Sequence, residues 1–507
     1  MQKPIRHIAI IGGGSAGWLS AAILASKFKC AESASIKITL IESDEFASVG
    51  VGEGTWPTMR ETIHTIGIDE KTFISACDVS FKQGSQFNLW RDNEINDSYL
   101  HPFTPPRAFE QFDLTSHYLQ QNTEQSFAES VCFQTALCQH NLAPKLGLDK
   151  SFQGFANYGY HLDAGKFAAL LKHHCTENLK VTHLNDTVEN VELDNDEFVK
   201  QLHLKSGNVV AADLFIDCSG FHSLLLDKTY GISIKDYSDV LLVNHAIATQ
   251  QPYPEGQSKI ASQTLSTAQE AGWIWDIDLS SRRGVGYVYN DTFISNDQAL
   301  ESLARYLNTT PDTLNVKHIK FQSGHREKFW HKNVIGIGLS AGFIEPLEAS
   351  ALMMIELSAK FIAEQLPPNG ALLPIVEKQF NQTFTARWES IVDFLRLHYQ
   401  LSERTEPFWR ASRSLKTLPQ GLNERLTLWQ YRPPINSDFM FAEEMFPAAS
   451  YQYILYGMNF QTDVSTLPHL TKEASRAAKL FELVKQQSAQ ALTRAQANNV
   501  VINQIKS

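Results

Sequence analysis

The fold of this 507-residue chain is decided by a stretch near its start, His7-Ile8-Ala9-Ile10-Ile11-Gly12-Gly13-Gly14-Ser15-Ala16-Gly17. The β-branched run bounded by glycines predicts a short buried strand. The glycines fit the pattern G-x-G-x-x-G, and the Ala- and Leu-rich segment Trp18–Phe28 predicts a helix directly after them. A second apolar run, Ile36–Ile41, predicts another strand that ends at the acidic Glu42. Strand, glycine turn, helix and second strand in this order predict a nucleotide-binding βαβ unit.

Each part of this motif has a role in holding a dinucleotide. Gly12 permits the tight turn, Gly14 lets the backbone approach a pyrophosphate, and Gly17 allows the helix to pack closely on the strand. The N–H groups at the helix start, at Ser15 and Ala16, face the phosphates together with the positive end of the helix dipole. Glu42 is placed to accept hydrogen bonds from the ribose hydroxyls. The alternative is a structural glycine turn, and the motif does not distinguish FAD from NAD.

Two later segments repeat the pattern of a strand that runs into a glycine turn. They are Asp213–Gly220 and Asn333–Gly342, the second of which contains Leu339. Taken singly, each predicts only a buried strand and its turn. Together with the start of the chain they resemble the FAD architecture of the aromatic hydroxylase superfamily. The resemblance implies an α/β fold class, the Rossmann-like FAD/NAD(P)-binding flavin monooxygenase fold, with Leu339 and Ile344 among the cofactor-binding residues.

The bulk composition limits what the chain can bind. A formal net charge of −11 argues against a nucleic-acid partner, because phosphate contacts need clustered Lys and Arg. The six cysteines form no C-x-x-C pair, so we expect neither a zinc site nor a disulfide framework, and no metal. No stretch approaches the about 20 apolar residues of a membrane span, which favours a cytoplasmic protein. His173 and His174, on a helix expected after Asp163, are interpreted as a solvated face rather than as metal ligands.

Four further motifs follow in order along the chain, and they resemble those of the flavin-dependent halogenases of the tryptophan halogenase family. They are Gly50-Val51-Gly52-Glu53-Gly54-Thr55, the segment Ser80-Phe81-Lys82-Gln83-Gly84, Gly272-Trp273-Ile274-Trp275-Asp276-Ile277, and Gly342-Phe343-Ile344-Glu345-Pro346-Leu347-Glu348-Ala349-Ser350-Ala351. The family patterns are G-V-G-E-x-T, G-W-x-W-x-I-P and G-F-x-E-P-L-E-S-T-G. Here Asp278 replaces the proline, and Ala349 and Ala351 replace serine and glycine.

The resemblance assigns roles to single residues. Gly50, Val51, Gly52 and Glu53 lie along the flavin. Lys82 and Glu348 are the catalytic pair, and the backbone amides of Ser350 and Ala351 hold the halide. The aromatic residues of the substrate or flavin side are His101, Phe103, Trp273, Trp275 and Tyr456. Period-two spacing places Trp273 and Trp275 on one face of a strand, where an ordinary packed tryptophan pair is the alternative.

The resemblance also implies a reaction and its partners. A separate NAD(P)H-dependent flavin reductase supplies FADH2, and O2 and chloride or bromide yield hypohalous acid that reaches Lys82. Lys82 donates a hydrogen bond to this acid or forms a haloamine, and an electron-rich small aromatic is then substituted. Two alternatives stay open: a flavin-dependent aromatic monooxygenase, and a non-catalytic flavoprotein.

The carboxy-terminal part resembles the family less closely. Family members that act on free tryptophan clamp it with a Tyr-Tyr pair, a Glu and a Phe-Trp, and Tyr451–Asn459 shows no such clamp. We therefore expect an indole-type substrate other than free L-tryptophan. Residues 1–379 are expected to form the FAD-binding part with an inserted β-sheet, and residues 380–507 a mainly helical substrate region. The oligomeric state is left open, with a homodimer as one alternative.

Overall fold

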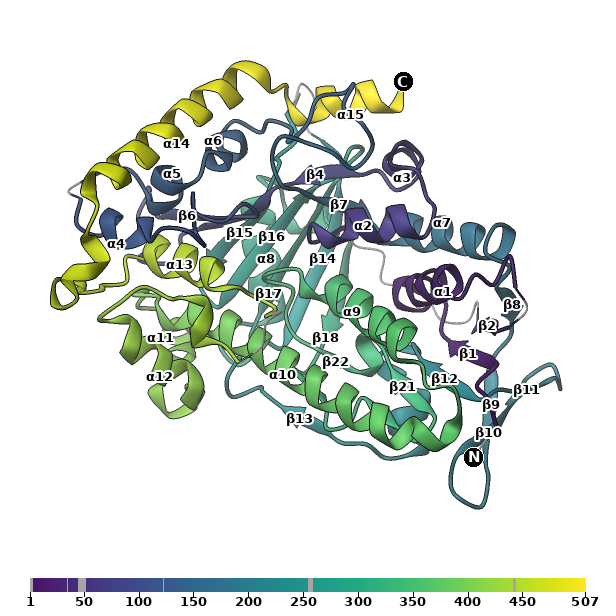
Figure 1. The fold of residues 1–507 in the computed structure, drawn as a ribbon. Helices are drawn as coiled ribbons and strands as arrows, with labels where there is room; N and C mark the ends of the chain where they lie inside the picture. The colour runs from purple at the N-terminus through teal and green to yellow at the C-terminus, as the bar shows by residue number, and fades with distance from the viewer. Residues whose placement is uncertain (1–2, 34, 44–51, 122, 254–258, 441–443) are drawn as a thin grey trace. The chain divides into compact units, whose positions relative to one another are not determined.

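A computed structural model describes residues 3–33, 35–43, 52–121, 123–253, 259–440 and 444–507 (Figure 1). The chain forms two units built from interleaved segments. Unit 1 comprises Met1–Asp78, Leu162–Asp236 and Gln322–Trp388, and unit 2 comprises Val79–His161, Tyr237–Phe321 and Glu389–Ser507. The residue-380 boundary expected from the sequence falls inside a long helix, α10 (Leu373–Gln400). Within the described ranges, no helix is long and apolar enough to cross a membrane.

Unit 1 is organised around a six-stranded sheet in the order β20-β21-β12-β1-β2-β8. β1 (His7–Ile11) pairs in parallel with β2 (Lys37–Glu42) on one side and with β12 (Leu214–Asp217) on the other. β12 also pairs in parallel with β21 (Val334–Gly336). Because parallel neighbours need a crossover connection, α1 (Ser15–Lys27) joins β1 to β2. The strands predicted on either side of the first glycine motif and in both later glycine segments are thus confirmed. The sheet is completed by β8 (Thr182–Asn185) and β20 (Trp330–His331).

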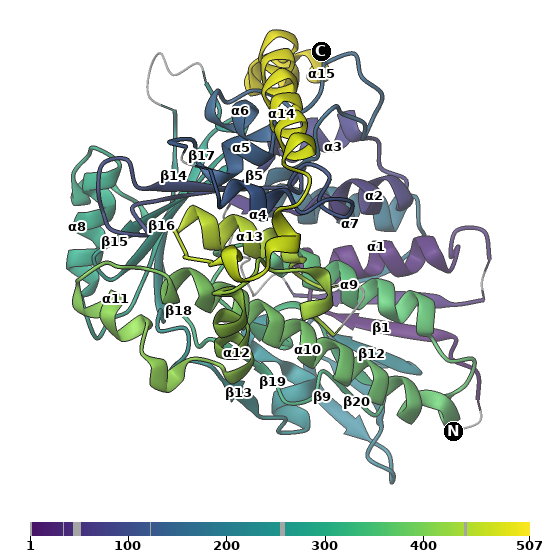
Figure 2. The ribbon, with the colours of Figure 1, turned by 60° about the vertical axis from the view of Figure 1, so that its left-hand side comes forward.

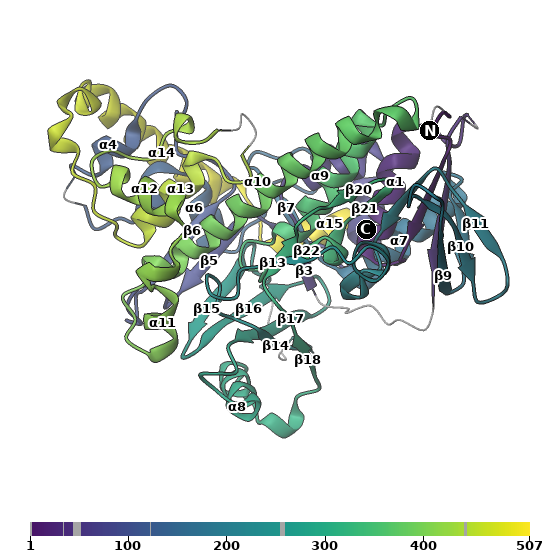
Figure 3. The same cartoon turned by 90° about the horizontal axis from the view of Figure 1, so that it is seen from below.

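Alternate residues of these strands face opposite layers, as the period of two requires. Ala9, Ile11 and Phe215 pack with Leu202 into one core against an antiparallel sheet in the order β11-β10-β9, whose strands lie side by side in Figure 3. On the other face α1 lies between two further helices, α7 and α9 (Figures 1 and 2). The bounds are β9 (Val188–Leu193), β10 (Val199–Leu204), β11 (Val209–Ala211), α7 (Ala164–Glu177) and α9 (Ser350–Gln365).

Shorter elements complete unit 1. The glycine turns after β12 and β21 continue into single helical turns, η1 (Gly220–His222) and η4 (Gly338–Ser340). The remaining elements are β3 (Gly52–Gly54), α2 (Thr58–Thr65), α3 (Glu70–Ala76), β13 (Ile234–Asp236), β19 (Gly324–Arg326) and β22 (Gly342–Phe343). The helix expected after Asp163 is α7, and β8, β9 and β10 follow it along the chain.

Unit 2 contains a seven-stranded sheet in the order β18-β14-β17-β16-β15-β5-β6, in which the β15–β5 pair is parallel. Its strands are β5 (Gly84–Asn88), β6 (Ser98–Pro102), β14 (His245–Gln251), β15 (Thr264–Gln269), β16 (Gly272–Asp278), β17 (Arg283–Tyr289) and β18 (Val316–Lys320). Just before β5, β4 (Ser80–Lys82) pairs in antiparallel fashion with residues 159–161 of β7 (Gly159–Asp163).

The helices of unit 2 come mostly from the carboxy-terminal part of the chain, as predicted. α14 packs against α4, α5 and α6 (Figure 2), and α13 lies on β6 (Figure 1). The bounds are α4 (Leu114–Tyr118), α5 (Phe127–Val131), α6 (Gln134–Gln139), α8 (Asn296–Tyr306), α11 (Pro407–Ser412), α12 (Gln420–Trp429), α13 (Ala448–Gly457), α14 (Ala474–Arg494) and α15 (Asn498–Lys506).

An aromatic cluster fills the core of unit 2. Trp90, on the loop after β5, packs edge-on against Phe87 and Trp409, with ring centroids 5.7 and 5.1 Å apart. Trp273 of β16 and Tyr399 of α10 contact the same ring. All five side chains are buried. Much of the aromatic content of the chain is therefore used for internal packing.

Candidate active site

The glycines of the first motif form a cradle whose close contacts differ from one position to the next. Gly12 has φ +110°, and a Cβ there would lie 2.2 Å from the carbonyl oxygen of Cys218. A Cβ at Gly17 would lie 1.8 Å from the carbonyl oxygen of Gly12, whereas at Gly14 it would meet no atom within 4 Å. Gly12 and Gly17 are therefore required by contacts within the protein. The open space at Gly14, at the start of α1, fits the approach of a pyrophosphate.

Glu42, at the end of β2, is held by several side chains that the sequence pattern did not reveal. Its Oε2 accepts a hydrogen bond from Trp18 Nε1 at 3.0 Å. Its Oε1 is paired with Lys172 Nζ and lies 3.2 Å from His183 Nε2. A carboxylate oxygen can accept more than one hydrogen bond, so these contacts fix the orientation of Glu42 and leave it able to accept from a ribose.

The three glycine turns of unit 1 converge at the carboxyl ends of the parallel strands. Ile337 N donates to Asp217 O at 2.9 Å, and Cys218 N donates to Ile11 O at 2.8 Å. A Cβ at Gly338, which has φ +73°, would lie 2.8 Å from the Cβ of Ala16. The turn after β21, which carries Leu339, is thus packed against the start of α1. In open α/β sheets, this edge is where ligands bind.

The motif around Glu53 is linked to the Glu348 block within unit 1. Trp56 Nε1 donates to the carbonyl oxygen of Glu348 at 2.9 Å, and Thr58 Oγ1 donates to Glu356 Oε2 of α9 at 3.3 Å. Thr62 Oγ1 also donates to Glu356. Burial raises the pKa of Glu53 to about 7. The predicted neighbours Gly50 and Val51 lie outside the described residues.

The residues assigned to halide binding stand at the first turn of α9. Ala349, the N-cap residue, has φ 54° and ψ 44°, the left-handed conformation, and Ser350 begins the helix. A left-handed residue followed by a right-handed one directs successive N–H groups toward a common point, which forms a concave anion site. Ser350 is buried and Ala351 is exposed. The backbone here fits the predicted role of the two amides. Ile344, a further predicted cofactor residue, is buried just after β22.

Lys82 is buried in unit 2, with 1% of its surface exposed. Its Nζ lies 5.5 Å from the centroid of the Phe103 ring, which is a cation–π distance. Lys82 stands opposite Gly159 in the β4–β7 ladder. The structure therefore brings Lys82 and Phe103 together, and it shows that Lys82 is not a surface residue.

His161, which the sequence motifs did not indicate, lies next to this lysine. It pairs with Ser80 in the ladder, and its Nε2 lies 2.8 Å from Thr264 Oγ1. Burial, and after it the charge of Lys82, holds the pKa of His161 well below its usual value. His161 is therefore neutral, and it adds no second positive charge to the surroundings of Lys82.

The predicted tryptophan pair lies on one face of β16, as its spacing requires. The rings of Trp273 and Trp275 are 6.4 Å apart. Trp273 packs against Trp90 in the aromatic cluster, and a Cβ at Gly286 would lie 2.1 Å from the Trp275 ring. The β16–β17 pairing thus admits Trp275 only because Gly286 lies beside it. Within unit 2 both side chains pack against their own unit, and a flavin-side role remains a prediction.

The aromatic residues expected around the substrate are largely occupied by unit 2 itself. His101 Nε2 lies 2.9 Å from Ser450 Oγ. Tyr456 packs on Phe127 with ring centroids 5.2 Å apart. Tyr451 and Tyr453 of α13 are also buried, and Tyr453 Oη donates to the carbonyl oxygen of Thr104. The tyrosines of α13 are therefore buried in the core of unit 2.

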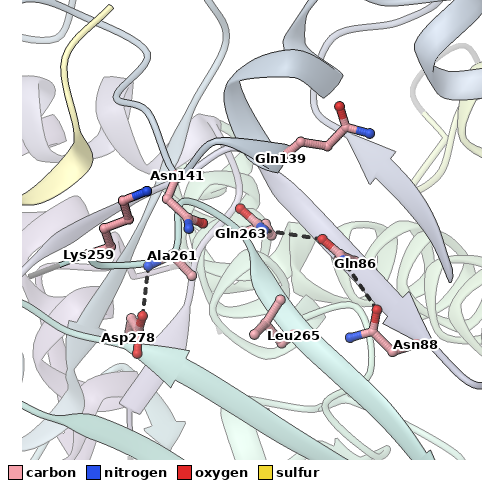
Figure 4. A pocket seen from close by; sticks show the side chains of 9 residues that line it. All are labelled: Gln86, Asn88, Gln139, Asn141, Lys259, Ala261, Gln263, Leu265 and Asp278. Atoms are coloured by element: carbon pink, nitrogen blue, oxygen red, sulfur yellow. Dashed lines mark hydrogen bonds between the residues drawn. The ribbon is translucent and has the colours of Figure 1, made fainter. Parts of the chain in front are cut away.

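An open groove of about 690 Å³ lies on the β5–β15 face of unit 2 (Figure 4). Gln263 Nε2 donates to Gln86 Oε1, and Gln86 Nε2 to Asn88 Oδ1, so three amides form a row. Asp278, which replaces the proline of the family pattern, accepts from Ala261 N at 2.7 Å. Burial raises its pKa to about 6. The groove contains none of the predicted site residues.

One minor prediction is wrong. His174 is buried rather than solvated, because α7 turns it toward the carbonyl oxygen of Ile66, 2.7 Å from its Nε2. The adjacent His173 is exposed, as predicted. Two adjacent residues on a helix point about 100° apart, so a pair at the edge of the packed face is divided in this way.

Two alanine substitutions should separate the structural from the ligand-binding glycines. In Gly17→Ala the Cβ meets backbone 1.8 Å away, so we expect a loss of about 1–3 kcal/mol of stability and loss of FAD binding. In Gly14→Ala nothing lies within 4 Å, so stability should be kept while the FAD dissociation constant rises about tenfold. Thermal unfolding and flavin titration measure the two effects. Wild-type FAD affinity in Gly14→Ala would contradict the assignment.

The buried Glu356 should make stability depend on pH. Burial raises its pKa to about 7 from 4.5. The folded protein therefore retains a proton that the unfolded chain releases, and stability falls as the pH rises from about 4.5 to 7. Glu356→Gln should gain on the order of 3 kcal/mol relative to wild type between pH 5 and pH 8, measured by urea unfolding. Glu364→Gln, at an exposed position on the same helix, should show no such gain.

Comparisons with known proteins identify the family and support the fold. The family model "Tryptophan halogenase" matches residues 7–472. The tryptophan 6-halogenase ThaL of Streptomyces albogriseolus is 32% identical over 455 residues, covering 86% of this chain and 84% of ThaL. The tryptophan 7-halogenase RebH of Lentzea aerocolonigenes is 29% identical over 516 residues, covering 96% of both chains. A crystal structure of tryptophan halogenase from Shewanella frigidimarina NCIMB 400 is 42% identical, with a TM-score of 0.96, and covers 100% of this chain and 98% of that one. The chain therefore belongs to the tryptophan halogenase family of flavin-dependent enzymes.

Proposed function

We propose that this enzyme uses reduced FAD and O2 to oxidise chloride or bromide to hypohalous acid, and that Lys82 delivers the halogen to an indole-type aromatic other than free L-tryptophan. The observation that carries the proposal is the buried ammonium of Lys82, 5.5 Å from the Phe103 ring in unit 2. Burying a lysine is costly unless its charge is used or compensated. A cation beside an aromatic wall suits a site that takes a polar oxidant and a flat substrate.

The cradle of unit 1 would hold the cofactor. The amides at Ser15 and Ala16 and the open backbone at Gly14 would receive the pyrophosphate, and Glu42 would accept from a ribose. Gly52, Glu53, Leu339 and Ile344 would line the rest of the cofactor. FAD in its reduced form supplies the two electrons that activate O2. The protein binds and orients the cofactor, and a separate NAD(P)H-dependent flavin reductase would be needed to reduce it.

The amides of Ser350 and Ala351 would bind the halide, for which the left-handed Ala349 gives the backbone its shape. In hypohalous acid the halogen has the oxidation state +1, so the ring carbon of the substrate can attack it while the oxygen leaves with the bonding pair. The ammonium of Lys82 hydrogen-bonds to that oxygen and transfers its proton to it, so that the leaving group departs as water. The carboxylate of Glu348 then takes the proton that the substituted ring carbon loses.

A neutral His161 supports this role of Lys82. A second cation next to the ammonium would repel it and favour its deprotonation. Because burial keeps His161 uncharged, His161 adds no positive charge beside Lys82. The haloamine route remains open, because it needs the same lysine in its neutral form for one step.

The substrate is inferred from α13. The tyrosines of Tyr451–Tyr456 pack inward, and Gln452 Nε2 donates to the carbonyl oxygen of Pro434. Gln452, Tyr453 and Tyr456 therefore have hydrogen-bond partners within unit 2 in place of an amino-acid backbone. We infer an aromatic acceptor whose binding does not require an α-amino and carboxylate clamp. Product mass distinguishes this reaction from monooxygenation, because a halogen isotope pattern replaces the gain of one oxygen.

Replacing Lys82 tests the assignment. Lys82→Met keeps the aliphatic stem and removes the ammonium, and we expect halogenated product to fall by about 10²–10⁴-fold. FAD binding and the oxidation of FADH2 should stay at wild-type levels, because the cradle belongs to unit 1. The reaction is run with a flavin reductase, NADH and each halide against a library of aromatics, and products are identified by mass spectrometry.

Lys145 offers a matched control. It is also buried at 1%, lies 5.9 Å from the Tyr158 ring, and donates to the carbonyl oxygen of Lys150. Lys145→Met loses a buried ammonium over an aromatic ring in the same unit, so its stability should fall while the folded fraction halogenates normally. Near-wild-type halogenation by Lys82→Met, or an equal loss in both variants, would overturn the proposed role.

A further inference from the structure

The peptide unit between Glu348 and Ala349 is fixed at both ends. Its carbonyl oxygen accepts from Trp56 Nε1 at 2.9 Å, and its N–H donates to the carbonyl oxygen of Pro346 at 3.1 Å. The second bond closes a four-residue turn over residues 346–349. The first comes from a residue almost three hundred positions earlier in the chain. Both donors and acceptors belong to unit 1.

The orientation of this peptide unit sets φ of Ala349, and with it whether Ala349 and Ser350 form the concave turn at the start of α9. With Ala349 at φ 54° and ψ 44°, the N–H groups of Ser350 and Ala351 begin α9 and have no intrahelical acceptor. Rotating the peptide plane by half a turn would return Ala349 to a negative φ. It would also destroy the sequence of left-handed and right-handed residues that forms the concave anion site.

Ala349 favours that rotation, because a residue with a Cβ is strained in the left-handed region. Only glycine adopts this conformation without a penalty. The conformation therefore persists because surrounding contacts oppose the strain. Of the two hydrogen bonds that hold this peptide unit, only the one from the Trp56 side chain can be removed by a side-chain substitution.

We propose that Trp56 is a positioning residue for halide binding: its indole N–H holds the Glu348–Ala349 peptide so that the amides of Ser350 and Ala351 face the halide. The inference rests on the proposed function of those amides, and it adds the hydrogen bond that keeps the turn before them in place. Trp56 touches neither the halide nor the cofactor in this role. It sets the fraction of molecules in which the anion site is formed.

The neighbouring contacts give Trp56 a fixed base from which to act. Its own carbonyl oxygen accepts from Met59 N in the first turn of α2. Thr58 and Thr62, in the first two turns of α2, donate to Glu356 of α9. Trp56 therefore lies just before a helix that is hydrogen-bonded to α9, the helix that the Glu348–Ala349 loop leads into.

The test measures halide binding directly in the full-length, FAD-saturated protein, from the broadening of the ³⁵Cl NMR line during a chloride titration. Trp56→Phe keeps the ring and removes the N–H. The net value of one such bond predicts a chloride dissociation constant about fivefold higher than that of wild type. When only part of the population is competent, affinity falls by that fraction and saturating ligand restores the competent state. The halide KM should therefore rise about fivefold while kcat at saturating halide stays within about twofold.

Glycine at position 349 supplies the rescue. Ala349→Gly removes the strain that favours the rotated peptide, so the double variant Trp56→Phe/Ala349→Gly should bind chloride within about twofold of wild type. The control is Trp330→Phe, which removes another indole-to-carbonyl bond of unit 1, from Trp330 Nε1 to Lys332 O at 3.0 Å. That variant should keep the wild-type chloride affinity. A general loss of stability would weaken both tryptophan variants and would not be repaired by glycine.

The outcomes separate this inference from the proposed function. Wild-type chloride affinity in Trp56→Phe, with broadening intact in the parent protein, overturns the inference alone. An equal loss in Trp330→Phe, or no rescue by glycine, overturns it as well. Absence of chloride broadening in the wild-type protein overturns the halide assignment and the inference together.

Discussion

The close approach of the Gly12 turn to the end of β12 is the contact on which the rest of unit 1 depends. Gly12 N donates to Ile41 O at 2.8 Å, and Cys218 N donates to Ile11 O at the same distance. The 2.2 Å that a Cβ at Gly12 would leave to Cys218 O means that only glycine permits this geometry. Because β1, β12 and β21 end together there, the turns that follow them converge at one edge. The three glycine motifs, which are far apart in the sequence, therefore lie next to one another in unit 1.

The same contact explains how distant segments come to serve one site. The block that begins after β22 follows the β21 turn, and the Glu53 motif is tied to that block by Trp56 and Thr58. Unit 1 therefore holds the cradle, Glu53 and the Glu348–Ala351 loop on a single connected framework. The notable feature of unit 2 is a buried lysine, Lys82. Gly159 lies opposite Lys82, the Phe103 ring lies beside it, and the neighbouring His161 is neutral.

Local patterns allowed much of this to be predicted. The βαβ start, the later glycine turns, the single face of Trp273 and Trp275 and the helical end all follow from periodicity and turn chemistry. The fold class and the family are confirmed. What could not be predicted depends on side chains that meet across hundreds of residues. Neither the burial of Lys82, the partners of Glu42, nor the contact of Trp56 with Glu348 leaves a signal in the neighbouring sequence. His174 illustrates the same limit, because its burial depends on a carbonyl group of a distant loop.

At two of the three positions where this chain departs from the family pattern, Asp278 and Ala349, a hydrogen bond to the residue or to its peptide unit accompanies the change. Asp278 stands where the pattern has proline, and its carboxylate accepts from Ala261 N while its carbonyl oxygen accepts from Ser80. A proline would offer the carbonyl but no carboxylate, so the aspartate joins the end of β16 to residue 261 as well as to β4. At Ala349 the change leaves a left-handed residue with no side-chain hydrogen bond of its own, and its peptide is held from outside by Trp56. The two cases differ in what the departure costs. Asp278 adds a bond to a strand end that is already paired, whereas at Ala349 the proposed halide site would depend for its shape on one indole. In the function that we propose, the second departure gives the chain a place where halide affinity can be tuned without altering any residue that touches the halide.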